Sequence, residues 1–142
     1  MRFTIYLYQN KKMPAFFREA MQEYEKRLTR YCKITLKIIK REKEWRSKVG
    51  SAKNAVLIVP GGKALQLSSV ELSQTIGQEE SHGVSGREIY IPSAEMLEYT
   101  SDKLSDKLAL SSFIHEPPMA GMILLEQLYR AYRILNGHPY HK

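Results

Sequence analysis

Residues 55–62 read AVLIVPGG, and this stretch decides the fold class. An unbroken apolar run of this length is typical of a strand that is buried on both faces, as in a parallel sheet. Pro60, Gly61 and Gly62 then end the strand in a turn. A strand buried on both faces needs helices above and below it, so we expect strands and helices to alternate along the rest of the chain.

The residues before this strand show that alternation. Phe3, Ile5 and Leu7 alternate with more polar residues, which is the period of a strand. Pro14 suits the first turn of a helix whose apolar positions recur on one face. We expect a strand at 3–7, a helix over 14–30, a second strand within 33–40, and an exposed, charged connection over 41–54 that holds at most a short helix.

The residues after the apolar run continue the pattern. Ser68, with Glu71 three residues later, is a capping-box pattern, and it opens a helix that lasts to about residue 79. We also expect a short strand at 88–91, a helix over 94–107, a strand or loop at 108–113, and a helix over 118–135 closed by Asn136 and Gly137. Together these elements predict an α/β fold, a single domain over residues 1–142 with one single-layer, largely parallel sheet flanked by helices.

The composition fits an ordinary globular domain. The 142 residues are 43% hydrophobic and 26% charged, which argues against a disordered chain. Cys32 is the single cysteine, so an internal disulfide and a multi-cysteine zinc site are excluded. No export signal is visible at the start of the chain, and we expect a reducing, cytoplasmic location and no membrane association.

The net charge of +7 is unevenly distributed. Residues 1–53 carry 15 Lys or Arg against 5 Glu, whereas residues 54–142 carry 7 against 10 acidic residues. A basic surface of this kind binds nucleic acid by releasing condensed counterions, although a basic face also serves solubility alone. The candidate RNA-binding residues in this part are Lys40, Arg41 and Lys43.

The last helix, over residues 118–135, is apolar around most of its circumference. Only a narrow strip, with Glu126, Arg130 and Arg133, is polar. One apolar face must pack on the sheet, and another is free to pack against a second copy of the chain. This pattern favours a homodimer over a helix enclosed by its own small domain.

Several familiar kinds of site are absent. VPGGKAL lacks the first glycine of a phosphate-binding loop and has Ala64 where that loop needs Ser or Thr. The four histidines and Cys32 match no zinc-binding spacing, so we expect no metal. Ser111 and Ser112 are not preceded by a nucleophile-elbow pattern, which makes them loop hydroxyls rather than acylating serines.

At residues 125–142 the chain reads LEQLYRAYRILNGHPYHK. This segment resembles the tail of the ribosomal RNA large subunit methyltransferase H family of the SPOUT superfamily, whose pattern is L-E-Q-x-Y-R-A-x-x-I-x-x-G-x-x-Y-H-K. The resemblance also covers EYEKRL at 23–28, the strand and turn at 58–63 with LSS at 67–69, and LALS at 108–111. It therefore extends over most of the chain.

The resemblance implies a C-terminal trefoil knot and a homodimer that acts on assembled ribosomes. The implied reaction transfers a methyl group from S-adenosylmethionine to N3 of a pseudouridine in 23S rRNA. The donor site implied by matching positions lies in the turns after three strands. Its cofactor-binding residues are Ile58, Ile91, Pro92, Leu110, Ser111, Ser112, Phe113, Ile114 and His115. The simpler alternative for Ile58 is a core position, and for Ser111 and Ser112 it is an ordinary loop.

On the acceptor side, the resemblance directs attention to the tail. His141 is the first candidate for contacting the nucleotide or assisting loss of its imide proton, because imidazole titrates near neutral pH. Tyr140 and Arg130 are further catalytic candidates, and Lys142 is expected to bind RNA phosphates. Alternatively, the terminus is frayed and without a role, and Arg130 pairs with Glu126 one helical turn earlier.

The chain departs from the family pattern near the implied donor site. Pro92 and Ser93 stand where the family has a Gly-Gly pair, and added Cβ atoms there narrow a pocket. Ile114, Pro117 and Gly121 replace the family's Thr, His and Arg. These departures leave a second hypothesis open, a catalytically weakened SPOUT-like homodimer that binds RNA or ribosomes without methylating them.

Overall fold

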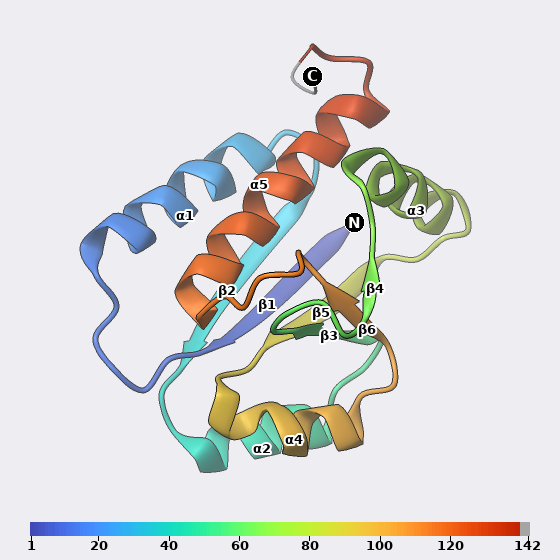
Figure 1. Ribbon diagram of the computed structural model, residues 1–142. Helices are drawn as coiled ribbons and strands as arrows, with labels where there is room; N and C mark the ends of the chain where they lie inside the picture. The colour runs from blue at the N-terminus through green and yellow to red at the C-terminus, as the bar shows by residue number, and fades with distance from the viewer. Residues whose placement is uncertain (140–142) are drawn as a thin grey trace.

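The computed structural model describes residues 1–139 (Figure 1). Tyr140, His141 and Lys142 lie outside the described residues. The strands are β1 (Arg2–Tyr8), β2 (Lys33–Ile39), β3 (Ala55–Val59), β4 (Leu65–Gln66), β5 (Gly86–Ile91) and β6 (Lys107–Ala109). The helices are α1 (Ala15–Leu28), α2 (Glu42–Gly50), α3 (Ser69–Ser81), α4 (Ala94–Lys103) and α5 (Pro117–Leu135).

All six strands form one sheet in the order β2-β1-β5-β3-β6-β4, and every neighbouring pair is parallel. The predicted α/β class and parallel sheet are confirmed. Helices α1, α5 and α3 lie over one face of the sheet, and α2 and α4 lie over the other (Figure 1). Because all strands run the same way, their carboxyl ends meet along one edge.

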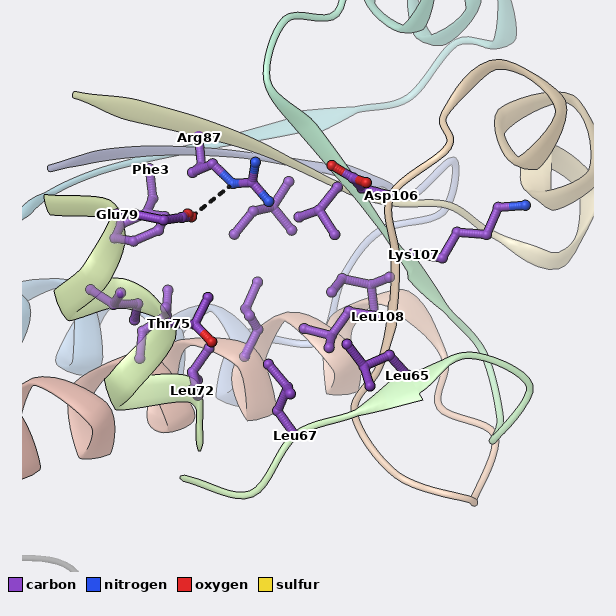
Figure 2. A pocket seen from close by; sticks show the side chains of 16 residues that line it. Phe3, Leu65, Leu67, Leu72, Thr75, Glu79, Arg87, Asp106, Lys107 and Leu108 are labelled. Atoms are coloured by element: carbon purple, nitrogen blue, oxygen red, sulfur yellow. Dashed lines mark ion pairs between the residues drawn. The ribbon is translucent and has the colours of Figure 1, made fainter. Parts of the chain in front are cut away.

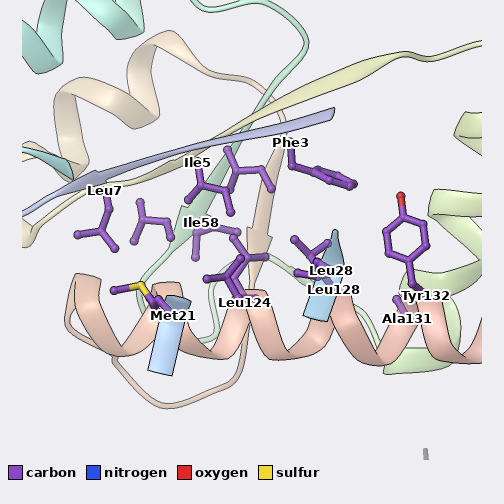
Figure 3. Packing of buried hydrophobic residues seen from close by; sticks show 14 of the residues in the cluster. Phe3, Ile5, Leu7, Met21, Leu28, Ile58, Leu124, Leu128, Ala131 and Tyr132 are labelled. Atoms are coloured by element: carbon purple, nitrogen blue, oxygen red, sulfur yellow. The ribbon is translucent and has the colours of Figure 1, made fainter. Parts of the chain in front are cut away.

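The two faces of the sheet carry separate cores, because successive side chains of a strand point to opposite sides. Phe3, Ile5 and Leu7 of β1 pack under α5 with Leu124 and Leu128, as Figure 3 shows. Tyr6 and Tyr8 instead point toward α2 and α4, where Trp45 is fully buried. The indole Nε1 of Trp45 donates a hydrogen bond of 2.9 Å to Thr100 Oγ1 and so joins the two helices of that face.

Local sequence signals set several element boundaries. The capping box predicted at the start of α3 is confirmed: Ser68 Oγ accepts a hydrogen bond from the Glu71 backbone N–H at 3.1 Å, and Glu71 Oε1 accepts one from the Ser68 N–H at 2.9 Å. These bonds hold the pKa of the Glu71 carboxyl below its usual value. Gly61, with φ of 79°, makes the turn after β3, a conformation that favours glycine.

Other boundaries differ from the expectation. The connection over 41–54 holds the short helix α2, as the expectation allowed, but it is not simply exposed, because Trp45 and Val49 of this helix are buried. The helix expected to reach residue 107 ends at Lys103, because Leu104 is extended and turns its side chain into the α2/α4 core. The short strand β4 was not expected, since its two residues are exposed and carry no alternating pattern.

Helix α5 lies between α1 and α3 and packs on the sheet through Gly121, Leu124 and Leu128 (Figures 1 and 3). Its own chain therefore covers three of its sides. The outward side still presents apolar residues, since Met119, Met122 and Ile123 are only partly buried. The homodimer and the trefoil knot stay predictions.

Candidate functional site

The turns that follow β3, β5 and β6 meet at the carboxyl edge of the sheet, beside the first turn of α5. They form a small hollow there. Six of the residues predicted to bind the methyl donor lie together in its wall, namely Ile58, Ile91, Pro92, Leu110, Phe113 and His115, and Val59, Pro60 and Ala120 complete it. The fold thus brings together positions that are more than 50 residues apart in the chain.

The remaining three predicted donor residues belong to the same loop. Ser112 lies against the glycine turn, because a Cβ placed on Gly62 would be 3.2 Å from the Ser112 Cα. Ile114 contacts the other glycine, with its Cγ1 3.5 Å from a Cβ placed on Gly61. The structure therefore gathers the whole segment 110–115 against the turn after β3.

Ser111 gives the segment its shape. Its Oγ accepts a hydrogen bond from the Phe113 backbone N–H at 3.1 Å and lies 2.8 Å from Nε2 of His115. Ser112 Oγ accepts a longer bond of 3.4 Å from the Gln66 side chain on β4. These local bonds hold a compact turn between β6 and α5, and they orient His115 toward the hollow.

The hollow is closed. Its free volume is about 10 Å³, room for about one water molecule, whereas sites for small molecules usually measure several hundred Å³. The apolar walls suit an adenine ring, but S-adenosylmethionine does not fit the space that this arrangement leaves. Phe113 is one of the wall residues and is nevertheless 78% exposed, and Ile114 beside it is 80% exposed. The side chains of Phe113 and Ile114 are therefore held by few packing contacts.

Two positions that depart from the family pattern, Ser93 and Gly121, suit the local backbone and core of this chain. Ser93 has φ of −75° and ψ of 170°, which any residue adopts, so this site does not need glycine. Gly121 lies where α5 crosses β1, and a Cβ there would be 2.7 Å from Leu7 Cδ1 and 3.1 Å from Met21 Sδ. An arginine at residue 121 has no room in this core.

The part of the tail that the structure describes is anchored away from the donor hollow. His138 donates its backbone N–H to Arg133 at 2.8 Å, and its Nδ1 lies 2.7 Å from the hydroxyl of Tyr31, which stacks on Tyr132. No sequence pattern pointed to Tyr31, since its partner is more than 100 residues away. The catalytic candidates Tyr140 and His141, and Lys142 with them, lie beyond this anchor and outside the described residues.

Arg130 makes the helical pair that the sequence offered as the simpler alternative. Its Nε and Nη2 donate to Glu126 Oε1 at 3.1 and 2.6 Å, and both side chains are partly buried. The residue lies ten positions after Ala120 on α5, about 15 Å along the helix from the hollow. Within one chain, Arg130 therefore does not contact the predicted donor site.

The candidate RNA-binding residues lie along the same edge of the sheet as the hollow. Lys40, Arg41 and Lys43 are exposed where β2 ends and α2 begins. Strand β2 is separated from β5 by β1 alone, which places their ends about 10 Å apart. A polyanion bound at this basic corner would pass close to the donor hollow.

Two further classes of site receive no support from the described part of the chain. In residues 1–139, no three metal-ligating side chains come together in a way that could hold an ion. Nor does any helix within those residues have the length and apolar character to cross a membrane.

Comparison with known proteins shows the family of the chain. A family model described as "Predicted SPOUT methyltransferase" matches residues 1–141. The chain belongs to the SPOUT methyltransferase family. This SPOUT methyltransferase is 34% identical over 142 residues to the ribosomal RNA large subunit methyltransferase H 1 of Thermoanaerobacter sp. (strain X514), with all of both chains covered.

Other relatives show the same relationship. The SPOUT methyltransferase is 31% identical to ribosomal RNA large subunit methyltransferase H of Clostridium botulinum (strain Eklund 17B / Type B), with 89% of this chain and 91% of that protein covered. It is 30% identical to the protein of that name from Acetivibrio thermocellus, with both chains fully covered. Membership of the family implies S-adenosylmethionine as the methyl donor.

Proposed function

We propose that this SPOUT methyltransferase transfers a methyl group from S-adenosylmethionine to N3 of a pseudouridine in 23S rRNA of the large ribosomal subunit. One observation carries the proposal: the residues expected to bind the donor converge on a single hollow at the carboxyl ends of β3, β5 and β6. The relatives' names point to the same chemistry, since they are ribosomal RNA large subunit methyltransferases. Because this substrate is part of the ribosome, we propose that the protein acts in the cytoplasm.

For the donor to bind, the segment 111–116 has to move away from the glycine turn. The exposure of Phe113 and Ile114 supports such a movement, because few packing contacts are lost when they shift. The opened hollow then offers apolar walls from Ile58, Ile91 and Leu110. The sulfonium of the donor supplies an already activated methyl group, so the part left to the protein is alignment and proton removal.

The rRNA is proposed to approach over the basic corner of Lys40, Arg41 and Lys43. These cations are exposed and follow the end of β2, which lies about 10 Å from the end of β5, so phosphates bound there leave a neighbouring base within reach of the hollow. Contacts with phosphates fix the register of the RNA but do not read its sequence. Lys142 is proposed to add a further phosphate contact.

His141 is proposed to assist the loss of the N3 proton, and Tyr140 and Arg130 to position the base. Within one chain, the described part of the tail lies far from the hollow. Residues 120 and 135 of α5 are about 22 Å apart along its axis, and His138 is tied to the last turn by its hydrogen bond to Arg133. Three residues, from His138 to His141, span at most about 11 Å.

A second copy of the chain could bring its own tail to the hollow. In the proposed homodimer the tail of one protomer completes the donor hollow of its partner. The partly buried Met119, Met122 and Ile123 on the outward side of α5 offer an apolar surface at the end of the helix nearest the hollow. A dimer formed there would bring a partner to the side of α5 where the hollow lies.

The direct test uses ribosomes from a strain that lacks the corresponding methyltransferase. The protein is incubated with these ribosomes and labelled S-adenosylmethionine, and the nucleosides of 23S rRNA are analysed by mass spectrometry. We expect one N3-methylpseudouridine, formed as the methyl leaves sulfur for N3, the N3 proton is released and S-adenosylhomocysteine remains. His141→Ala should reduce the yield strongly. A labelled product at another atom, or none, contradicts the proposal.

The second hypothesis, an RNA-binding homodimer that does not methylate, is favoured by the closed hollow and by Pro92 in its wall. Calorimetric titration with S-adenosylmethionine separates the two hypotheses. Micromolar binding supports the enzyme. Absence of heat at millimolar donor, with ribosome binding retained, supports the second hypothesis.

A further inference from the structure

A larger cavity lies between the sheet and helices α3 and α5, toward the amino ends of the strands (Figure 2). Its volume is about 330 Å³, which falls within the range of sites for small molecules. It shares one wall residue, Ile58, with the donor hollow. The cavity is therefore a separate space, and ligand binding in it does not depend on methyl transfer.

The walls of the cavity are mainly aliphatic and come from every surrounding element. They are Val56, Ile58, Ile89 and Leu108 of the sheet, Leu72 and Ile76 of α3, and Leu124 and Leu128 of α5. Leu65 of β4 stands at the rim and is 63% exposed. An apolar body that replaced water against these walls would gain hydrophobic stabilisation in proportion to the area it covers.

One wall of the cavity carries an incompletely satisfied carboxylate. Glu79 of α3 forms an ion pair with Arg87 of β5, in which Oε1 and Nε are 3.5 Å apart (Figure 2). The Oε2 atom is buried, and none of the residues that the structure describes donates a hydrogen bond to it. Such an acceptor is costly to leave unpaired.

Arg87 does not donate a hydrogen bond to Glu79 Oε2, because its guanidinium also binds Asn54. Its Nη1 donates a hydrogen bond of 2.8 Å to Asn54 Oδ1, at the start of β3. The remaining charged side chains, Asp106 and Lys107, lie on the far side of the cavity from Glu79 (Figure 2). The terminal torsion of a glutamate is broad, so a small rotation turns Oε2 toward a donor placed in the cavity.

We propose that this cavity binds a small amphiphilic amine, with its apolar body among the aliphatic walls and its ammonium group donating to the Glu79 carboxylate. The ion pair at 3.5 Å leaves Glu79 only partly neutralised, which favours a cation over a neutral donor. An anionic head group is disfavoured next to Glu79, since like charges repel at close range.

The test uses three indole probes that differ only in their head group: tryptamine as the ammonium, tryptophol as the neutral alcohol and indole-3-propionate as the anion. Binding is measured by protein NMR titration with the full chain. We expect saturable shifts at the cavity residues, with tryptamine at least about tenfold tighter than tryptophol and no saturation by indole-3-propionate. Equal affinities, or preference for the anion, overturn the proposal.

Two matched variants locate the site. Thr75 and its neighbour Gln74 on α3 are both exposed, but only Thr75 lines the cavity. Thr75→Trp should abolish tryptamine binding, and Gln74→Trp should leave it unchanged. Glu79→Gln should remove the preference of the ammonium over the alcohol while tryptophol still binds. If the Thr75→Trp variant binds tryptamine as tightly as the unmodified chain does, tryptamine does not occupy this cavity. The proposal then fails.

Discussion

Gly121 shows how a single residue of α5 is fixed by its neighbours. A Cβ at this position would lie 2.7 Å from Leu7 Cδ1 and 3.1 Å from Met21 Sδ, and both of those side chains are fully buried. The close approach lets α5 settle onto β1 and α1 at once. The arginine that the family pattern has here would find no room in this core.

The first prediction concerns this close approach. Gly121→Val should lower the free energy of unfolding by about 1–3 kcal/mol, because its extra carbons overpack a core that has no space to relax. Gly50→Ala is the matched control, since nothing lies within 4 Å of a Cβ on Gly50 at the end of α2. Urea unfolding of the two variants checks this. Equal stability of Gly121→Val and the unmodified chain would contradict the packing argument.

The second prediction concerns Cys32, a half-buried free thiol. Burial raises its pKa from 9.0 to about 11. Because the folded state favours the neutral thiol, this contribution to stability is present below about pH 9 and is lost as the pH rises toward 11. At pH 8, iodoacetamide should alkylate the native chain at least about tenfold more slowly than the chain in urea. Similar rates would show that the thiol is accessible and has an ordinary pKa.

At the scale of elements, the proposed opening of the donor hollow depends on movement of the loop between β6 and α5. The third prediction tests its movement with a disulfide. An ideal Cβ on Gly62 lies 3.5 Å from the Ser112 Cβ, within the range of about 3.5–4.5 Å that a disulfide requires. In a Cys32→Ala background, oxidised Gly62→Cys/Ser112→Cys should not bind S-adenosylmethionine, and reduction should restore binding.

The control for the disulfide is the same variant kept reduced throughout, which isolates closure of the loop from the two substitutions. Calorimetric titration before and after reduction gives both measurements. Unchanged donor affinity in the oxidised form would mean that the segment 111–116 need not move.

The fourth prediction concerns the corner between β2 and α2. Replacing Lys40, Arg41 and Lys43 with alanine should weaken ribosome binding and lower its dependence on salt, because fewer counterions are released. The matched control removes three cations from the opposite edge of the sheet, Lys26, Lys33 and Lys53, which are also exposed. Filter binding at two salt concentrations compares the two triple variants. An equal loss of ribosome binding in both triple variants would mean that net charge, and not the position of the three cations, determines binding.

The elements that the sequence predicted well are those whose signal is local. Alternation marks β1, the apolar run marks β3, and the capping box marks the start of α3. The strand β4 had no such signal, because Leu65 and Gln66 are exposed and are held only by their pairing with β6. The end of α4 depends on the burial of Leu104 in a core formed by distant residues, which no local pattern contains.

Some features of the candidate site were predicted from the sequence, and others are seen only in the fold. Resemblance supplied the donor residues, and the structure brings six of them into one hollow. The sequence contained no indication that the hollow is so small, since its walls come from turns that only the fold brings together. The contact between Tyr31 and His138, and the second cavity beside Glu79, also join residues that only the fold brings together.

At the scale of the whole molecule, the two halves of the proposed active site lie at opposite ends of α5. The donor hollow is beside its first turn, and the tail leaves from its last turn, where His138 is anchored. Because of this separation, we propose that two chains share each active site. Size-exclusion chromatography with light scattering should therefore give a dimer, and a monomer would remove the shared site.

The measurement that tests this account most directly mixes two inactive chains. One carries His141→Ala, and the other carries the oxidised Gly62→Cys/Ser112→Cys disulfide in the Cys32→Ala background, so each homodimer lacks one half of the site. Native mass spectrometry confirms that heterodimers have formed, and methyl transfer to ribosomes is then measured. The account predicts that the mixture regains a substantial fraction of the activity, because each heterodimer pairs an intact hollow with an intact tail. Heterodimers that remain as inactive as their parents would contradict it.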